Sequence, residues 1–575
     1  MSAIAAPAAV DAPRASRGSI AESMATHGGL WLLLAGLLAF LTLPLAMLFI
    51  RSVEDKSGAF VGFANFVAYA QTPSLEVSTV NSLTFAFYTT LLVVPLAFGY
   101  AYAIQRTCIR WKGLWRSIAL VPILAPSMLP ALSFIYLFGN QGVLKGVLPW
   151  VGLTQIYGLP GMVLAMVFSA FPHAVMILLA SLALADARLY EAADALGTSA
   201  WRRFLTVTLP GAKYGLISAM MVVFTMAIAE FGVPKIIGGR FQVLAVDVYK
   251  QVIGQQNFHM GAVVGLILLL PAVVAFVVDY QVRRKQQALL TTRSVPYAPR
   301  PSRGRDLAFL ALVILVSIVT LGVIGMAVFG SFVKFWPYNL SLTTQHYTYG
   351  FAEAGLERAY PNSLVMACWC AVLGAAITFA GAYWIEKTRG GGFVKPLIRF
   401  QALLPMSVPG LVLGIGYILF FNSPSNPLGF LYGTMGILVI CTIIHFYSSS
   451  HLTAVTALKQ LDGEFESVSA SLKVPFYKTF WRVTLPVCLP SVLDISRYYF
   501  VNAMTTISAV VFLYSPKTTL ASVSIIRLDE IGAIGSAAAM ATLIVATSAV
   551  VTVLALFGET WLLRRTQRWR TLART

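Results

Sequence analysis

The 575-residue chain is 58% hydrophobic and only 11% charged, and its mean hydropathy is +0.78. This composition excludes a soluble protein, and apolar runs of about 20 residues exclude a β-barrel, whose strands alternate over about ten residues. The formal net charge of +19 could indicate nucleic-acid binding, but the cations follow individual apolar runs, as Arg283, Arg284 and Lys285 do. Because the positive-inside rule produces this placement, no nucleic-acid partner is expected.

Long apolar runs follow one another along the chain and predict about twelve membrane-spanning helices. Their length and continuity predict an all-α protein within the lipid bilayer. Pro122, Pro126 and Pro130 fall in the third run and predict an irregular, broken helix near a central path. The first six runs lie near residues 29–50, 82–106, 117–138, 160–184, 213–238 and 260–280, and the second six near 307–333, 361–386, 398–421, 433–458, 490–515 and 534–562.

A basic, proline-containing segment, residues 286–306, separates the first six runs from the second six. It predicts a cytoplasmic linker between two halves, residues 29–285 and 307–575, and the Ala/Ser-rich residues 1–28 predict a flexible cytoplasmic tail. Because six is an even number, both halves are expected to enter the membrane in the same direction. Basic clusters after even-numbered runs predict that both termini are cytoplasmic.

Each half carries one polar stretch after its fourth apolar run. The first reads EAADALGTSAWRRFLTVTLP over residues 191–210, and the second reads ESVSASLKVPFYKTFWRVTLP over residues 466–486. In the first stretch, apolar residues at helical spacing, then Gly197 and Ser199, predict a helix, a left-handed turn and a second, capped helix. One amphipathic connection would be ordinary, but its duplication at the same place in both halves indicates a function.

The first stretch resembles the EAA loop of ABC-importer permeases, in which this loop is a coupling helix that inserts into a cleft of a cytoplasmic ATPase. The second stretch keeps the Leu-Pro ending, but its acid lies one place early and a lysine replaces the glycine. The resemblance implies coupling loops at residues 186–210 and 462–486, with unequal docking surfaces. The residues that it assigns to ATPase coupling are Glu191, Ala192, Ala193, Gly197, Leu209, Pro210, Glu466, Lys473, Leu485 and Pro486.

The same resemblance covers most of the chain, and both halves are similar to permease domains of the ferric-iron, thiamine and phosphonate group. It implies a fused-dimer permease of type I in the inner (plasma) membrane. The implied partners are a cytoplasmic ATP-binding subunit, expected as a homodimer, and a periplasmic solute-binding protein. ATP and Mg would bind that subunit, because no lysine here follows a glycine and a G-x-x-x-x-G-K loop is excluded. No zinc-type spacing or nucleophile motif occurs, so no metal, cofactor or catalytic residue is expected in this chain.

Two polar residues within apolar runs are candidates for the translocation path. Glu230 lies about two-thirds along the fifth run, where an acid is costly and indicates function, although it could equally pair near the outer mouth. His173 either lines the path or bonds a backbone carbonyl that Pro172 leaves free. The alternative class is an ion-coupled secondary transporter, which would favour several intramembrane acids and needs no duplicated loop.

The resemblance also suggests a substrate. Residues 229–262 and 505–525, like the second polar stretch, are more similar to 2-aminoethylphosphonate permeases than to ferric-iron permeases. Lys235, Arg240 and Lys250 follow the fifth run on the outer side, where they could attract an anionic solute or binding-protein face, or could be ordinary loop charges. The expected substrate is 2-aminoethylphosphonate, with ferric iron as the alternative and thiamine or another small solute behind it.

Overall fold

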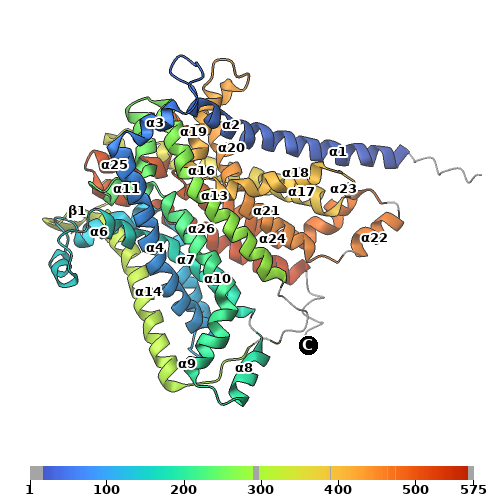
Figure 1. Cartoon of the computed structure of the whole chain (residues 1–575), viewed down its shortest axis with the longest axis horizontal. Coiled ribbons are helices and arrows are strands. Elements are labelled where there is room, and N and C mark those ends of the chain that lie inside the picture. The colour runs from blue at the N-terminus through green and yellow to red at the C-terminus, as the bar shows by residue number, and fades with distance from the viewer. Residues whose placement is uncertain are drawn as a thin grey trace, which may run out of the picture.

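The protein is helical and built from two repeats, as seen in a computed structural model (Figure 1). The structure describes residues 17–184, 186–288, 295, 297–388, 390–462, 464–472 and 474–566. Within them, eight helices are long and apolar enough to span a membrane, or eleven if each bent helix pair is one span. The predicted all-α membrane fold is confirmed. The eleventh apolar run corresponds to α24, which is not among these spans and carries Asp494 and Arg497.

The helices of the two halves follow the same order. The first half contains α1 (Arg17–Leu37), η1 (Leu38–Thr42), α2 (Leu43–Ser52), α3 (Ala64–Ala70), α4 (Pro73–Arg106), α5 (Lys112–Leu120), η2 (Val121–Leu124), α6 (Met128–Phe138), η3 (Lys145–Val151), α7 (Leu159–Ala183), α8 (Ala187–Ala195), α9 (Ala200–Arg203), η4 (Phe204–Thr208), α10 (Leu209–Ile228), α11 (Gly232–Ile237), α12 (Leu244–Tyr249), η5 (Lys250–Gly254) and α13 (Phe258–Ala288).

The second half adds one antiparallel hairpin, the only sheet in the described residues. It contains α14 (Arg303–Phe332), β1 (Val333–Phe335), β2 (Asn339–Leu342), η6 (Gln345–Tyr347), α15 (Tyr349–Glu353), α16 (Ala359–Trp369), η7 (Cys370–Gly374), α17 (Ala375–Lys387), α18 (Val394–Leu403), η8 (Leu404–Ser407), α19 (Gly410–Phe421), η9 (Gly429–Leu431), α20 (Met435–His445), α21 (Tyr447–Lys459), α22 (Glu464–Ser471), α23 (Phe476–Thr479), η10 (Phe480–Thr484), α24 (Leu485–Thr505), α25 (Ala521–Glu530) and α26 (Ile534–Thr566).

The third span of each half is broken at equivalent prolines. In the first half the chain turns by 98° between Lys112–Leu124 and Met128–Phe138, and in the second by 112° between Val394–Ser407 and Gly410–Phe421. Pro126 lies in the first break, where the preceding Ala125 is extended, because proline disfavours helix in the residue before it. Pro122 lies in the short 3-10 helix η2 that leads into the break. The predicted break is confirmed. Its copy at Pro405 and Pro409, with the same spacing, was not predicted.

The first span of each half packs on the other half. Helix α2 lies against α19, and the Tyr417 hydroxyl donates to the Phe40 carbonyl at 2.6 Å. Helix α14 lies against α6, where the Ser133 hydroxyl donates to the Val323 carbonyl at 2.7 Å. Each first span also keeps a contact within its own half, α2 with α13 and α14 with α26. The two halves are therefore interlocked by a pair of crossed helices.

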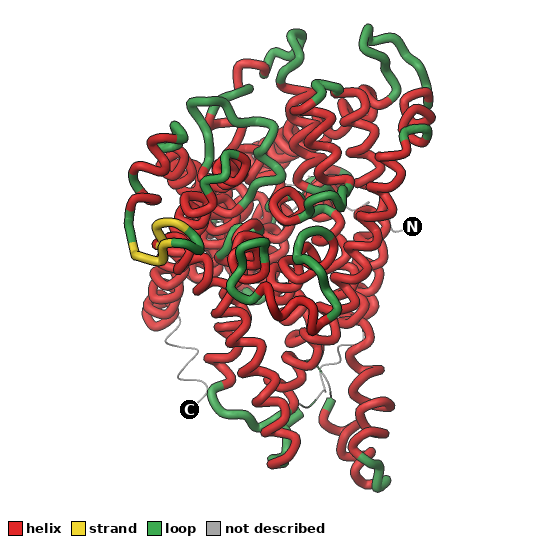
Figure 2. The backbone as a smooth tube through the Cα atoms, turned by 90° about the vertical axis from the view of Figure 1, so that its left-hand side faces the viewer, coloured by secondary structure: helices red, strands yellow, loops and turns green. Residues whose placement is uncertain are grey.

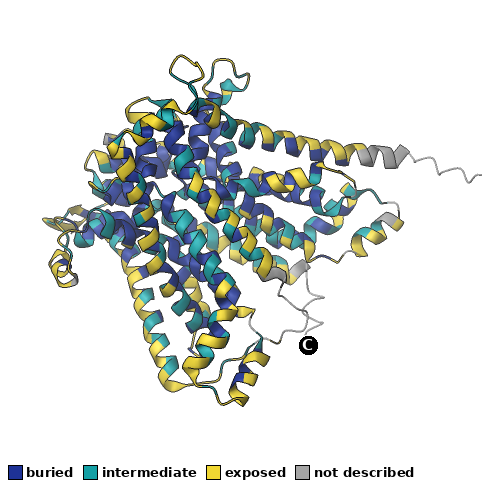
Figure 3. Cartoon of the chain, viewed as in Figure 1, coloured by how far each residue is buried: buried dark blue, intermediate teal, exposed yellow. Residues whose placement is uncertain are grey.

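The molecule has two distinct ends. Two arms diverge in Figure 1, one ending at α8 and α9 and the other at α22 and α23, and we call this the loop end. Helices α3, α11 and α25 and the β-hairpin lie at the opposite, hairpin end, which faces the viewer in Figure 2. Buried residues concentrate where the halves converge (Figure 3). Outward-facing apolar residues such as Leu315, Ile318 and Val319 of α14 are exposed, as expected for helices in contact with lipid.

Candidate functional site

The first polar stretch folds as the predicted helix, turn and helix. Asp186 begins α8 by accepting a hydrogen bond from the Arg188 amide at 3.1 Å. Gly197 follows α8 with a φ of +65°, the left-handed conformation that glycine adopts at little cost. Ser199 caps α9 by accepting from the Arg202 amide at 3.3 Å. This local structure is confirmed.

The first loop exposes apolar side chains at the loop end. Leu189, Leu196 and Trp201 are 58%, 80% and 70% exposed. Glu191 and Ala192 are also exposed, whereas Ala193 is buried at the base of α8. An exposed apolar cluster on an otherwise polar loop is typical of a protein-binding surface. Of the EAA residues, the structure thus leaves two on the surface and one in the packing beneath it.

The second loop presents a similar surface, but its second helix begins with a different residue. Phe465, Val468, Leu472 and Tyr477 are all 41% exposed or more. Pro475 precedes α23 without a side-chain cap, where the first loop has a serine. Lys473, which replaces the glycine of the first loop, lies outside the described residues.

Behind both loops the chain enters the fifth span through a π-helical turn. The turn is η4 in the first half and η10 in the second, and each is followed by a Leu-Pro pair, Leu209–Pro210 and Leu485–Pro486, that opens α10 and α24. In the first half the helix continues from Ala200 to Ile228, so Pro210 lies inside it and removes one helical hydrogen bond next to the π-turn. π-Turns are rare and concentrate at functional positions, so their duplication here marks the junction between loop and span.

A phenylalanine of each π-turn packs against aromatic rings of the second span, and we call this contact the aromatic seat. The Phe204 ring lies 6.1 Å from both Phe98 and Tyr102 of α4. The equivalent Phe480 lies 6.0 Å from Phe379 and 4.8 Å from Tyr383 of α17. These distances between ring centroids lie in the range of favourable aromatic pairs, which here are edge-to-face or tilted. Motion of either loop is therefore linked by direct packing to the second span of its half.

The predicted coupling residue Glu466 faces inward. Its carboxylate pairs with the Lys387 ammonium at 2.9 Å, and the two side chains are only 23% and 11% exposed. At the corresponding place in the first half, the guanidinium of Arg106 lies 4.8 Å from the Tyr190 ring. The sequence predicted Glu466 as a coupling residue one position before the equivalent of Glu191, which is the position of Tyr190. The structure adds its ion-pair partner, Lys387.

Glu230 caps a helix. Its carboxylate accepts from the amides of Gly232 and Val233 at 2.9 and 3.2 Å and from the Ser127 hydroxyl. It thereby joins the break in the third span to the start of α11. His173 lies in α7 beside Pro172, and its Nδ1 has no partner among the described residues. Glu230 thus has structural partners, and none of its hydrogen bonds goes to His173.

The three outer cations are not a free cluster. Lys235 pairs with Glu530 of the second half at 2.8 Å, and Lys250 lies 3.8 Å from Asp247, while Arg240 is exposed. Two carboxylates therefore neutralise much of the field that was expected to attract an anion. Glu530 could not be recognised from sequence as a partner, because it comes from the other half.

Aromatic residues join the halves beside the Lys235–Glu530 pair. Tyr249 lies 5.1 Å from Phe231 in its own half and 6.2 Å from Phe512 in the other. Lys235 also lies 5.3 Å from the centre of the Tyr249 ring. At this end the interface between the halves is closed by an ion pair and by tilted aromatic rings.

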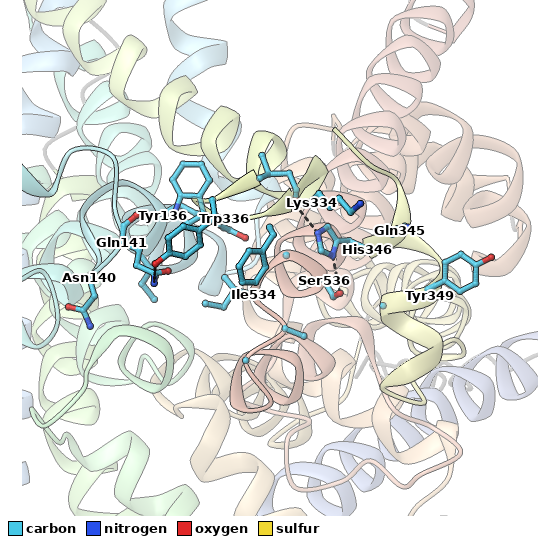
Figure 4. A pocket seen from close by; sticks show the side chains of 18 of the residues that line it. Tyr136, Asn140, Gln141, Lys334, Trp336, Gln345, His346, Tyr349, Ile534 and Ser536 are labelled. Atoms are coloured by element: carbon cyan, nitrogen blue, oxygen red, sulfur yellow. Dashed lines mark hydrogen bonds between the residues drawn. The ribbon is translucent and has the colours of Figure 1, made fainter. Parts of the chain in front are cut away.

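A cavity of about 820 Å³ lies between the halves at the hairpin end. Tyr136 and Gln141 come from the first half and Trp336, His346 and Ser536 from the second (Figure 4). Both nitrogens of His346 are engaged, one with the Val333 carbonyl at 2.9 Å and one with the Ser536 hydroxyl at 3.5 Å. The histidine therefore holds the hairpin to α26 rather than offering a free base to the cavity.

Comparison with known proteins identifies the family to which this architecture belongs. Residues 74–287 and 373–568 each match the model of the binding-protein-dependent transport system inner membrane component. The ferric transport system permease protein FbpB of Actinobacillus pleuropneumoniae is 27% identical over 79% of this chain and 67% of its own length. A Haemophilus influenzae protein provisionally named ferric transport system permease FbpB 1 is 27% identical over 74% of this chain and 68% of its own.

Among solved structures, a bacterial ABC transporter that imports the acidic polysaccharide alginate is 19% identical, with a TM-score of 0.38, over 47% of this chain and 99% of that one. The two matched copies together cover more than half of the chain, and the crossed spans α1–α2 and α14 lie outside both of them. The chain therefore belongs to the binding-protein-dependent transport permeases, the membrane-spanning subunits of ABC importers, and carries two copies of their domain.

Proposed function

We propose that this permease couples ATP hydrolysis by a cytoplasmic subunit to the import of ferric iron delivered by a periplasmic binding protein. The docking surfaces for the ATPase are the exposed faces of α8–α9 and α22–α23. One observation supports this role above the others: a helix–turn–helix with exposed apolar residues occurs in both halves, on the same π-turn and the same aromatic seat. The ion-coupled alternative loses its support, because the family is that of ABC permeases.

The packing provides a route for the motion. When the ATPase subunits close, they would draw the two arms of the loop end together. Each π-turn would carry that displacement into the fifth span, and each aromatic seat into the second span. At the hairpin end, the Lys235–Glu530 contact joins the halves and would have to separate for solute to enter from outside. The permease itself supplies no catalytic group to this cycle.

The docking proposal is tested by placing a charge on each end of the molecule. Leu196→Glu alters a side chain that is 80% exposed on the first loop, and Leu340→Glu alters one that is 52% exposed on the hairpin. We expect roughly tenfold less ATPase to copurify with the first variant and no change with the second, because apolar anchors dominate interface energies. Equal copurification by both variants would remove α8–α9 as a docking surface.

Ferric iron is favoured as substrate because the relatives that match most of this chain are named as ferric permeases. 2-Aminoethylphosphonate remains the second candidate, supported by the resemblance of residues 229–262 and 505–525. Its electrostatic support is weaker than expected, since Lys235 and Lys250 have acidic partners. One relative over a shorter stretch is a sulfate transport permease of Synechococcus elongatus, and sulfate, like a phosphonate, is an oxyanion.

One pair of uptake measurements separates the candidates. A deletion strain is compared with its complemented parent for ⁵⁵Fe(III) uptake and for growth on 2-aminoethylphosphonate as sole phosphorus source. Loss of iron uptake with normal growth supports the ferric proposal. Loss of growth with normal iron uptake assigns the phosphonate instead. Normal behaviour in both assays, in a strain without redundant importers, rejects both substrates.

A further inference from the structure

The linker between the halves packs against the first coupling loop. The amide of Ala187, the first residue of α8, donates to the Val295 carbonyl at 2.9 Å. The Val295 amide in turn lies 3.4 Å from the Asp186 carboxylate, which caps the same helix. The linker therefore occupies the backbone groups at the start of α8, where a helix has amides to satisfy.

A buried arginine joins the linker to this loop. Arg106, at the end of α4, is 3% exposed, and its guanidinium lies 4.8 Å from the Tyr190 ring and 4.6 Å from the Tyr297 ring. The two rings are themselves 4.3 Å apart, so the cation rests on a pair of aromatic faces. Its Nη2 also donates to the Leu182 carbonyl at 3.0 Å, near the end of α7. Two spans, the coupling helix and the linker thus meet at one side chain.

The linker reaches the other end of α8 as well. Arg300 lies 3.5 Å from the carboxylate of Asp194, which also pairs with Arg203 of α9. Between these contacts, the thiol of Cys108 donates to the Pro299 carbonyl at 3.3 Å. The described linker residues therefore follow the length of α8 from its cap to its last turn.

Within the described residues, the second loop is held by a direct ion pair and not by a linker. Lys387 and Glu466, which occupy the places of Arg106 and Tyr190, pair directly with each other. Removing Tyr297 would leave the Arg106 cation with one ring in place of two. No described residue makes a corresponding contact at the second loop, so in this part of the chain the linker contact belongs to the first loop.

We propose that linker residues 295 and 297–300 form a brace that positions α8 for the ATPase, with Tyr297 as its main positioning residue. The brace rests on the proposed function only in that α8 is taken to meet the ATPase. Because α14 continues from the linker and packs on the first half, the covalent join between the repeats acts as part of the first coupling loop.

The contact itself is tested without substrate or ATPase. Cys108 is exposed and hydrogen-bonded to the linker. Cys368 is also exposed but lies elsewhere, and the other three cysteines are buried. In a Cys368→Ser background, maleimide labelling of Cys108 is compared in the parent, Tyr297→Ala, Tyr297→Phe and Tyr349→Ala. We expect Tyr297→Ala to label about tenfold faster, the factor for losing one desolvated cation–π contact. Tyr297→Phe keeps the ring and Tyr349→Ala changes the hairpin end, so both should label like the parent. Equal rates in all four would overturn the brace.

The positioning role is tested in the complete importer in proteoliposomes. The readout is the rise in ATP hydrolysis on adding Fe(III)-loaded binding protein, divided by the rate without it. We expect Tyr297→Ala to reduce this ratio at least threefold, with Tyr297→Phe restoring it. An unchanged ratio alongside faster Cys108 labelling would reject the positioning role while leaving the contact intact. A parent importer that shows no stimulation would count against the iron substrate, and the labelling result would still decide the contact.

Discussion

Helix α8 packs through its Tyr190 on Arg106 and on a segment of the linker, whereas α22 is held by a direct ion pair between its Glu466 and Lys387. Beneath these supports the two loops are alike, with the same π-turn and the same phenylalanine seated on the second span. The backbone geometry that transmits motion is thus kept in both halves, while the chemistry that holds each coupling helix differs. If both loops meet an ATPase as proposed, their different supports allow the two contacts to respond unequally.

The largest expected effect is at the turn of the first loop. Gly197→Val places a β-branched residue at a φ of +65°, which costs on the order of 1–3 kcal/mol. Nothing lies within 4 Å of the added Cβ, so the cost is conformational rather than steric. We expect roughly tenfold slower transport. Gly197→Asn, which enters the left-handed region more easily, should retain most activity.

The same substitution in the second loop sharpens the comparison. Lys473→Val changes a position that already lacks glycine, so transport should fall less than in Gly197→Val. If both valine variants were equally slow, the two loops would be functionally equivalent despite their different supports. If Gly197→Asn were as slow as Gly197→Val, the side chain itself, and not the backbone, would disturb the docking surface.

A double-mutant cycle tests whether the Lys387–Glu466 ion pair holds the second loop. Lys387→Met and Glu466→Met each leave a partly buried charge without its partner and should each lower stability by about 1–3 kcal/mol. The double variant should lose less than the sum, because neither charge is then stranded. Thermal unfolding of the purified permease measures all four states. Strict additivity would show that this ion pair does not hold α22.

At the hairpin end the first half contributes Lys235 and the second half Glu530 to one ion pair. Exchanging the two charges tests whether these residues are in contact. Lys235→Glu should weaken the closed interface through repulsion from Glu530, by about 1 kcal/mol given the exposure of both groups. Adding Glu530→Lys should recover most of this loss. The measurement is the binding-protein-independent ATPase rate, which should rise in the single variant and return in the double. If the double variant had the same raised ATPase rate as the single variant, Lys235 and Glu530 would not be in contact.

The smallest expected effect is a pH dependence at the same interface. Burial and the neighbouring Glu530 raise the pKa of Asp529 to about 6 from an ordinary value of 3.8, and Lys235 opposes the rise. A raised pKa favours the protonated acid in the folded state, so its contribution to stability is present below pH 4 and lost as the pH rises through about 6. Asp529→Asn should therefore raise the melting temperature by about 1–3 °C at pH 7.5 and by less at pH 5. An equal gain at both pH values would rule out titration of Asp529.

Local features of the fold could be predicted where one residue type dictates a conformation. Gly197 marked the left-handed turn, Ser199 the cap, and Pro122 with Pro126 the break in the third span. The equivalent spacing of Pro405 and Pro409 carried the same information, and comparing the halves for proline would have found it. Apolar runs predicted the spans themselves, because length and hydropathy alone decide what can cross a bilayer.

Contacts between distant segments could not be predicted. Periodicity tells which face of a helix is apolar, but not which neighbour covers it, so the crossing of α2 and α14 between the halves has no signal in the sequence. The ion pair of Glu466 with Lys387 could not be predicted either, because Lys387 belongs to another helix. Tyr297 lay in a segment read only as a linker, and nothing nearby in the sequence pointed to Arg106.

The crossed first spans also constrain how the protein is made. Translation delivers the first half first, yet α6 lacks its partner α14 until the second half has begun to emerge, and α2 waits still longer for α19. Neither repeat can finish packing alone, so each holds an unfinished face until the other arrives. In a version made of two separate chains, the same crossing would be an exchange of arms between polypeptides, dependent on their concentration. Joining the repeats in one chain makes that exchange intramolecular and independent of expression level.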